Sequence, residues 1–114
     1  MKQYGLIGKT LGHSFSKKFF TEKFSQESIE AQYDLFELPE ITHFPCLTQQ
    51  HEFYGLNVTI PYKESVIQYL DELDKIASEI GAVNTIKFIR KNGRTSLKGY
   101  NTDIIGFTNS ITPH

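Results

Sequence analysis

Three polar side chains gather in one short run near the middle of the sequence, NVTIPYK at residues 57–63. Asn57 offers an amide and Thr59 a hydroxyl, and because they are two positions apart in an extended segment they should point to one face. Lys63 adds an amine, which can donate a proton to a developing oxyanion or accept one when neutral. Most lysines are solvated surface charges, but polar residues within an apolar strand need partners. The run therefore indicates a polar site.

Two further runs carry candidate groups. In HSFS, Ser14 and Ser16 stand at the expected start of a helix, where two hydroxyls and free backbone N–H groups suit an anion such as a carboxylate. The same serines would equally serve as simple helix caps. We therefore keep both readings of this run open.

The runs GAVNT and GYNTD each contain an Asn-Thr pair. Asn84 and Asn101 could bind a ligand or form turns, and Asp103 could be an acidic group or a helix cap. Asp103 and Lys63 would make an acid/base pair if the fold joins them, but spacing along the chain cannot show that. These groups together indicate a site for a small hydroxylated or anionic molecule, without specifying a reaction.

The sequence does not match the common nucleotide-binding or zinc-binding motifs. The GKT at residues 8–10 lacks the glycine that a phosphate loop needs five positions before Gly8, since position 3 is Gln3, and no G-x-G-x-x-G occurs in the sequence. Cys46 is the single cysteine, and with four scattered histidines it gives no zinc spacing and no internal disulfide. We expect no cofactor-binding loop and no metal site in this chain.

Composition sets broad limits. The 114 residues fit one domain, and nine Phe and six Tyr supply a core. The 12 basic and 13 acidic residues do not favour nucleic acid or an anionic membrane as partner. The N-terminus does not resemble a signal peptide, and no apolar run approaches the roughly 20 residues of a membrane span. The single cysteine fits a reducing cytoplasm.

The elements that must position these groups alternate between strands and helices. Strands are expected over 3–8, 31–38 and 53–60, and a hairpin over 82–100 turns at Asn92-Gly93. Helices are expected from Ser14 or Ser16, around Pro45, and after Pro61. Three sets of positions at helical spacing predict the later helices. They are Val66, Ile67 and Leu70; Leu73, Ile76, Ala77 and Ile80, with Gly81 as the stop; and Ile104, Phe107, Thr108 and Ile111.

This alternation predicts a three-layer α/β/α sandwich with a mainly parallel sheet and a C-terminal antiparallel hairpin. In such sheets, ligands bind beyond the carboxyl ends of the strands. The candidate polar residues all fall in loops at or near strand ends, which makes that edge of the sheet the expected site.

Four runs in order, GLIGKTLGHSFSKKF, GLNVTIPYKESV, IGAVNTI and GYNTDIIGF, resemble the N-terminal substrate-binding domain of shikimate dehydrogenase across residues 1–114. The resemblance implies an NADP-dependent oxidoreductase that interconverts 3-dehydroshikimate and shikimate on the route to chorismate and the aromatic amino acids. It implies that Ser14 and Ser16 hold the substrate carboxylate and that Thr59 and Asn84 bind ring hydroxyls. Lys63 and Asp103 match the catalytic lysine and its acidic partner, and Asn57 supports them.

The family also carries a Rossmann-type NADP-binding domain, which we expect to be absent from this chain. We therefore expect these residues, as one domain of a longer enzyme, to turn over nothing alone, and exposed apolar surface to permit a homodimer. Two alternatives remain: a stand-alone module that binds a small polyol acid, and a relative that also accepts quinate.

Overall fold

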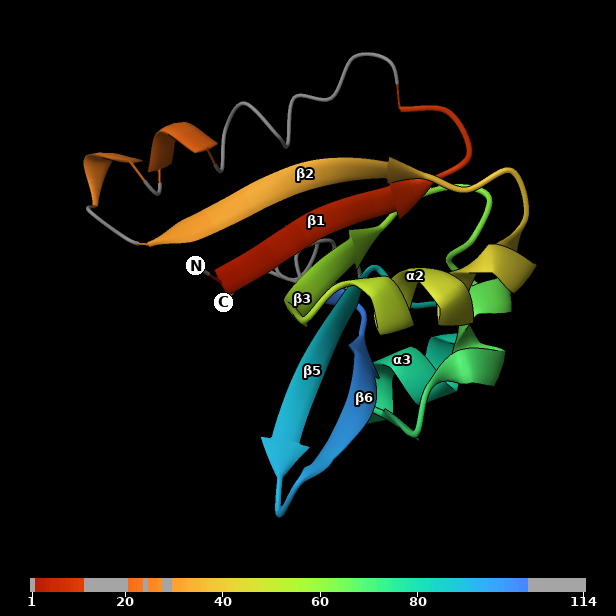
Figure 1. Ribbon diagram of the computed structural model, residues 1–114. Coiled ribbons are helices and arrows are strands. Elements are labelled where there is room, and N and C mark those ends of the chain that lie inside the picture. Colours follow the sequence, from red (N-terminus) through yellow and green to blue (C-terminus); the bar gives the residue numbers. More distant parts are fainter. Residues whose placement is uncertain (1, 12–20, 24, 28–29, 103–114) are drawn as a thin grey trace, which may run out of the picture.

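The computed structural model describes residues 2–11, 21–23, 25–27 and 30–102. Six strands form one sheet in the order β2-β1-β3-β5-β6-β4 (Figure 1). Their bounds are β1 Lys2–Gly8, β2 Ala31–Glu37, β3 Phe53–Val58, β4 Glu72–Leu73, β5 Thr85–Lys91 and β6 Arg94–Tyr100.

Strand directions match the predicted class. β1 runs parallel to both β2 and β3, and β4 runs parallel to β6. β5 is antiparallel to β3 and to β6, and the β5–β6 pair is the expected hairpin. Asn92 and Gly93 form its turn with φ of 53° and 75°, a left-handed backbone that Asn and Gly adopt at low cost. The mainly parallel sheet with a C-terminal hairpin is confirmed.

Four short helices between residues 41 and 80 pack on one face of the sheet (Figure 1). They are η1 Ile41–His43, α2 Phe44–Gln50, η2 Ser65–Tyr69 and α3 Lys75–Ile80, where η marks a 3-10 helix. Phe44, Val66 and Ala77 enter one core cluster with Ile7 and Ile86 of the strands. Of the helix predicted from Ser14 or Ser16, residues 21–23 and 25–26 are described and are helical, and the Glu27 N–H donates to the Lys23 carbonyl at 3.0 Å. The rest of that helix and the one predicted around Ile104 and Phe107 lie outside the described residues.

Local sequence explains the helix ends. Pro45 lies in the first turn of α2, where a missing N–H costs nothing. The Asp74 side chain accepts a hydrogen bond from the Ile76 N–H at 3.1 Å and caps α3. Gly81 ends α3 with φ of 77°, as its position in the sequence predicts. No helix among the described residues combines the length and apolar character that a bilayer crossing requires.

One predicted element is wrong. The sequence pattern places Leu73 at the start of the second helix beyond Pro61, but Leu73 belongs to β4, where it pairs with Gly99 of β6. The Asp71 carboxylate accepts the Leu97 N–H at 2.8 Å and brings this segment against the sheet. Periodicity does not separate Leu73 from α3, because a two-residue strand shows no alternation and its partner is distant in sequence.

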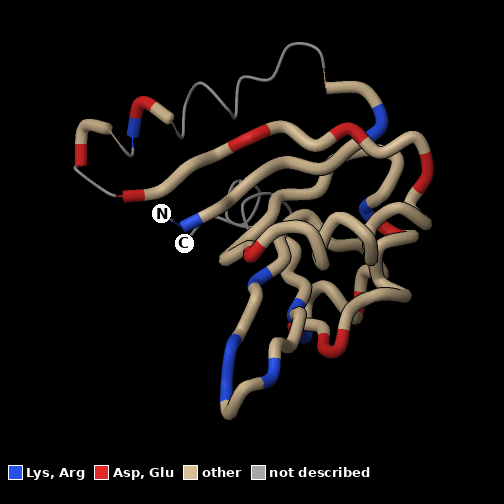
Figure 2. The backbone as a smooth tube through the Cα atoms, viewed as in Figure 1, with Lys and Arg blue, Asp and Glu red and all other residues tan. Residues whose placement is uncertain are grey.

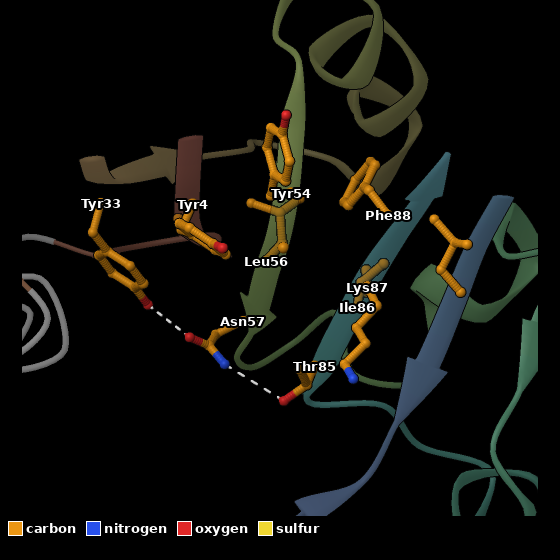
Figure 3. Close-up of a pocket in the computed structure, with 12 residues that line it drawn as sticks. Tyr4, Tyr33, Tyr54, Leu56, Asn57, Thr85, Ile86, Lys87 and Phe88 are labelled. Carbon is orange, nitrogen blue, oxygen red and sulfur yellow. Dashed lines mark hydrogen bonds between the residues drawn. The ribbon is translucent and has the colours of Figure 1, made fainter. Parts of the chain in front are cut away.

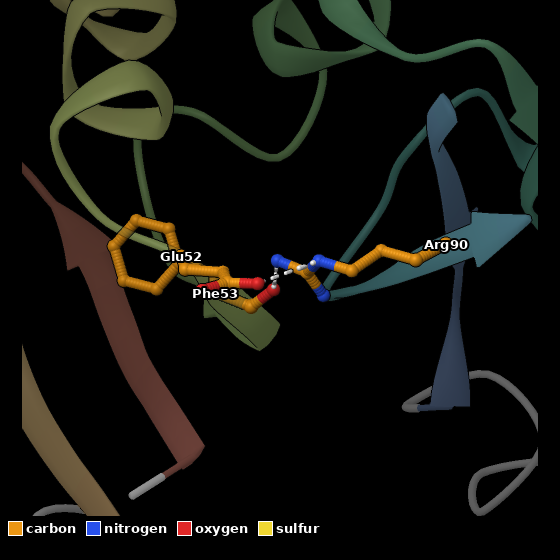
Figure 4. Close-up of polar contacts among 3 residues, drawn as sticks. All are labelled: Glu52, Phe53 and Arg90. Carbon is orange, nitrogen blue, oxygen red and sulfur yellow. Dashed lines mark hydrogen bonds and ion pairs between the residues drawn. The ribbon is translucent and has the colours of Figure 1, made fainter. Parts of the chain in front are cut away.

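The β5–β6 hairpin is basic and anchored. It carries five Lys or Arg residues and no Asp or Glu. Blue marks its basic positions in Figure 2. Arg90 ties it to the start of β3 (Figure 4). The Arg90 Nη2 donates to the Phe53 carbonyl at 2.5 Å, and its Nε lies 3.4 Å from the Glu52 carboxylate. This contact holds the hairpin at the amino end of β3, the end away from the predicted site.

Candidate functional site

A polar hollow lies where four strand ends meet. β1 and β3 are parallel, so their carboxyl ends share an edge of the sheet, and the antiparallel β5 begins at that edge while β6 ends there. The hollow measures about 290 Å³. Its lining residues in the described part of the chain are Leu6, Asn57, Val58, Thr59, Lys63, Asn84 and Thr102.

Backbone hydrogen bonds bring the distant segments of this hollow together. The Val58 N–H donates to the Asn84 carbonyl at 2.8 Å, and the Asn84 N–H donates to the Tyr100 carbonyl at 2.9 Å. The Val83 N–H donates to the Lys63 carbonyl at 2.7 Å. Half-buried Lys63 is thereby held beside Asn84, although 21 positions separate them in sequence.

Thr59 is fixed against the end of β1. Its N–H donates to the Ile7 carbonyl at 3.0 Å. A Cβ on Gly8 would lie 2.6 Å from the Thr59 methyl and 2.8 Å from a methyl of Leu11, so only glycine fits there. Gly8 therefore serves close packing of two loops.

Asn84 is buried, with 8% of its surface exposed, and its side chain makes hydrogen bonds to two threonines. Its Oδ1 accepts from the Thr85 hydroxyl and from the Thr102 N–H, each at 3.0 Å. Its Nδ2 donates to the Thr102 hydroxyl at 3.0 Å. A buried amide held by these partners has a fixed orientation, which suits it to bind a ligand's hydroxyl.

Asn57 belongs to the face of the sheet opposite the helices. Leu56 and Val58 on either side of it enter the core, so Asn57 points the other way. Its Oδ1 accepts from the Tyr33 hydroxyl at 2.9 Å, and its Nδ2 donates to the Thr85 hydroxyl at 3.5 Å (Figure 3). Asn57 thus links the edge strand β2 to the start of β5.

That face also holds a larger hollow of about 460 Å³, lined mainly by apolar and aromatic side chains (Figure 3). Tyr54 and Ile89 at its border are 38% and 40% exposed. Asn57 is common to both hollows, so the polar site adjoins an apolar surface.

Tyr62 fastens the loop that carries Lys63. Its ring is buried, and its hydroxyl donates to the Leu38 carbonyl just beyond β2. Burial raises the pKa of Tyr62, and the negative charge of Glu40 raises it further. The neutral tyrosine is therefore the form that holds this loop in place.

The structure brings four of the seven predicted site residues together: Asn57, Thr59, Lys63 and Asn84. The other three, Ser14, Ser16 and Asp103, lie outside the described residues, and the roles of all seven stay predictions. The sequence left Asn101 as either a ligand-binding residue or a turn former. In the structure its side-chain amide donates to the Ala82 carbonyl at 3.1 Å.

Sequence reasoning missed Thr85 and Thr102, which hold the Asn84 amide, and Tyr33, which holds Asn57. A signal for the two threonines was present, because each follows an asparagine in a repeated Asn-Thr pair. The sequence offers no comparable signal for Tyr33, since its contact spans 24 positions.

Comparison with known proteins decides the family. The family model described as the shikimate dehydrogenase substrate binding domain matches residues 6–86, which is most of the chain and includes six of the seven residues that line the hollow. The chain belongs to this family. The resemblance seen in the sequence is thereby confirmed for this shikimate dehydrogenase domain.

Relatives of this domain agree in sequence and fold. A shikimate dehydrogenase (NADP(+)) of Halothermothrix orenii is 46% identical over 105 residues, covering 90% of this chain and 35% of the relative. The crystal structure of shikimate dehydrogenase 1 from Peptoclostridium difficile is 39% identical with a TM-score of 0.83, covering 94% of this chain and 40% of that one.

A third relative was solved with ligands. The shikimate 5-dehydrogenase from Thermus thermophilus, in complex with NADP(H) and shikimate, is 29% identical with a TM-score of 0.82, covering 97% of this chain and 41% of that one. The present chain spans about 40% of the length of the first curated relatives that it matches.

Proposed function

We propose that the polar hollow binds shikimate and 3-dehydroshikimate and that this domain supplies the substrate half of an NADP-dependent shikimate dehydrogenase. The supporting observation is that Asn57, Thr59, Lys63 and Asn84 line one hollow of about 290 Å³. That volume lies at the lower end for ligand sites, which suits a single small ring. The family membership and the shikimate bound in the Thermus thermophilus relative support the same ligand.

Each side chain has a task in this proposal. Thr59 and Asn84 bind ring hydroxyls, because a hydroxyl and a primary amide pair well with alcohol groups. Lys63 donates a proton to the carbonyl oxygen during reduction and takes it back in the reverse direction. Ser14 and Ser16 bind the carboxylate, and Asp103 orients Lys63 and the substrate.

NADP supplies the hydride in such enzymes and is named in the curated relatives. We assign its binding to a part of the enzyme that this chain does not span. The 114-residue chain alone should therefore bind shikimate and show no NADPH-dependent turnover.

The test is an NMR titration of the chain with shikimate. The signals of Thr59, Lys63 and Asn84 should shift together and saturably, and Lys63→Met should weaken binding because it removes a donor to the ligand. Lys91→Met, at the far end of β5, is the matched control and should bind like the wild type. Shifts scattered over the surface, or no saturation, would contradict the proposal.

We also propose that the chain self-associates through the face that bears Tyr54 and Ile89, because both are partly exposed beside an apolar hollow. Light scattering over a concentration series should show the mass rising toward a dimer. A constant monomer mass would exclude it.

A further inference from the structure

The polar side chains beside the hollow form one hydrogen-bonded row with a fixed direction. The Tyr33 hydroxyl donates to Asn57 Oδ1 at 2.9 Å, and Asn57 Nδ2 donates to Thr85 Oγ1 at 3.5 Å, the longest link (Figure 3). The Thr85 hydroxyl donates to Asn84 Oδ1 at 3.0 Å. A hydroxyl has a single proton, so Thr85 receives on one side and gives on the other.

This direction determines what Asn84 offers a ligand. Its Oδ1 is occupied by two donors, the Thr85 hydroxyl and the Thr102 N–H. Turning the amide over would set Nδ2 against the Thr102 N–H, donor against donor in a buried place. One Nδ2 proton goes to the Thr102 hydroxyl at 3.0 Å, so the second Nδ2 proton is what Asn84 can offer to the hollow, and its ligand must place an acceptor oxygen there.

We propose that Thr85 is a positioning residue for substrate recognition: it holds the Asn84 amide so that Nδ2 donates to a ring oxygen of the substrate. Thr85 is not among the residues that line the hollow, so it acts through Asn84. Tyr33 and Asn57 support Thr85 from behind. This assignment rests on the proposed function. It adds that Asn84 is the donor and the substrate oxygen the acceptor in their hydrogen bond.

The first experiment measures shikimate affinity by calorimetry. Thr85→Val keeps the side-chain shape and removes the hydroxyl, and we expect about three- to tenfold weaker binding, the worth of one hydrogen bond. Thr85→Ser keeps the hydroxyl and should bind within about twofold of wild type. Tyr33→Phe, one link further away, should weaken binding less than Thr85→Val. Thr95→Val, an exposed threonine on β6, is the control and should change nothing.

The second readout separates positioning from a general structural effect. Among shikimate analogues that each lack one ring hydroxyl, one should lose affinity for the wild type because Asn84 has lost its acceptor. In Thr85→Val, the penalty for that analogue alone should shrink. Equal weakening of shikimate and every analogue by Thr85→Val would overturn the positioning role.

A ligand-free measurement tests the positioning independently of shikimate. The Asn84 side-chain amide gives two proton signals, and these should shift or broaden in Thr85→Val and remain as in wild type in Thr85→Ser. Unchanged Asn84 signals in Thr85→Val would overturn the inference, whatever binds in the hollow. A wild-type chain that binds no shikimate would count against the proposed function instead.

Discussion

At the scale of single residues, the hollow depends on groups that never face a ligand. Gly8 lets Thr59 lie against the end of β1, and Thr85 and Thr102 saturate the oxygen of the Asn84 amide. Such supporting groups set the geometry of a site as firmly as the residues that line it, because a displacement of about 1 Å is enough to weaken a polar contact.

Gly8→Ala tests whether a supporting residue sets the geometry of the hollow, because it adds a single methyl group beside Thr59. The added Cβ would lie 2.6 Å from the Thr59 methyl, so Thr59 must move and the loop must shift. We expect about 1–3 kcal/mol lower free energy of unfolding, as for other overpacked sites, together with weaker shikimate binding. Urea unfolding and calorimetry measure the two effects.

Gly55→Ala is the control for Gly8→Ala. Its Cβ would lie 3.2 Å from the ring of Tyr4, a side chain that can move aside. It should cost less stability than Gly8→Ala. Equal losses for the two variants would show that Gly8 has no special contact with Thr59.

At the scale of elements, most of the strands and the hairpin turn could be predicted from local sequence. Short runs that end in Gly or Pro predicted β1, β2 and β3, and Asn92-Gly93 predicted the hairpin turn. β4 could not be predicted, because its pairing with β6 is a tertiary contact and two residues carry no period.

The candidate site, too, could be predicted only in part from the sequence. Residue types and the Asn57/Thr59 spacing predicted a polar strand end, and both residues line the hollow. That Lys63 lies beside Asn84 follows from the Val83 N–H bond to the Lys63 carbonyl, which no local pattern encodes. Family resemblance supplied that link, whereas elementary chemistry alone left it open.

Gly81→Ala measures how much the glycine that ends α3 contributes to the free energy of unfolding. Gly81 has φ of 77°, and an added Cβ would meet no atom within 4 Å, so any loss reflects backbone conformation alone. We expect about 1 kcal/mol lower free energy of unfolding. Gly81→Asn should lose less, because asparagine tolerates the left-handed region better. Urea unfolding of both variants checks this, and an unchanged Gly81→Ala midpoint would contradict it.

At the scale of the whole molecule, Tyr62 joins the loop that carries Lys63 to the segment after β2 through the Leu38 carbonyl. The raised pKa of Tyr62 means that the folded chain holds the neutral phenol more tightly than the unfolded chain does. Its stabilising contribution is therefore complete below the ordinary tyrosine pKa of about 10 and is lost as the pH rises above it.

Tyr62→Phe should remove that alkaline loss. Near pH 7 the variant should be about 1 kcal/mol less stable, because the Leu38 carbonyl loses its donor. As the pH rises above about 10, the stability gap to the wild type should close, since only the wild type has Tyr62 to ionise. Tyr54→Phe, on a partly exposed ring, is the control and should leave the pH profile unchanged. A gap that stays constant with pH would contradict the assignment.

The β5–β6 turn has a practical consequence. β5 begins at the hollow, and each strand of the hairpin runs seven residues, about 20 Å, away from it to the exposed tip at Asn92 and Gly93. Exposed hairpin tips accept added sequence with little effect on the rest of a fold. A chain immobilised through this tip would leave the substrate end facing bulk solution, so surface-based affinity measurements can be made without blocking the ligand's approach.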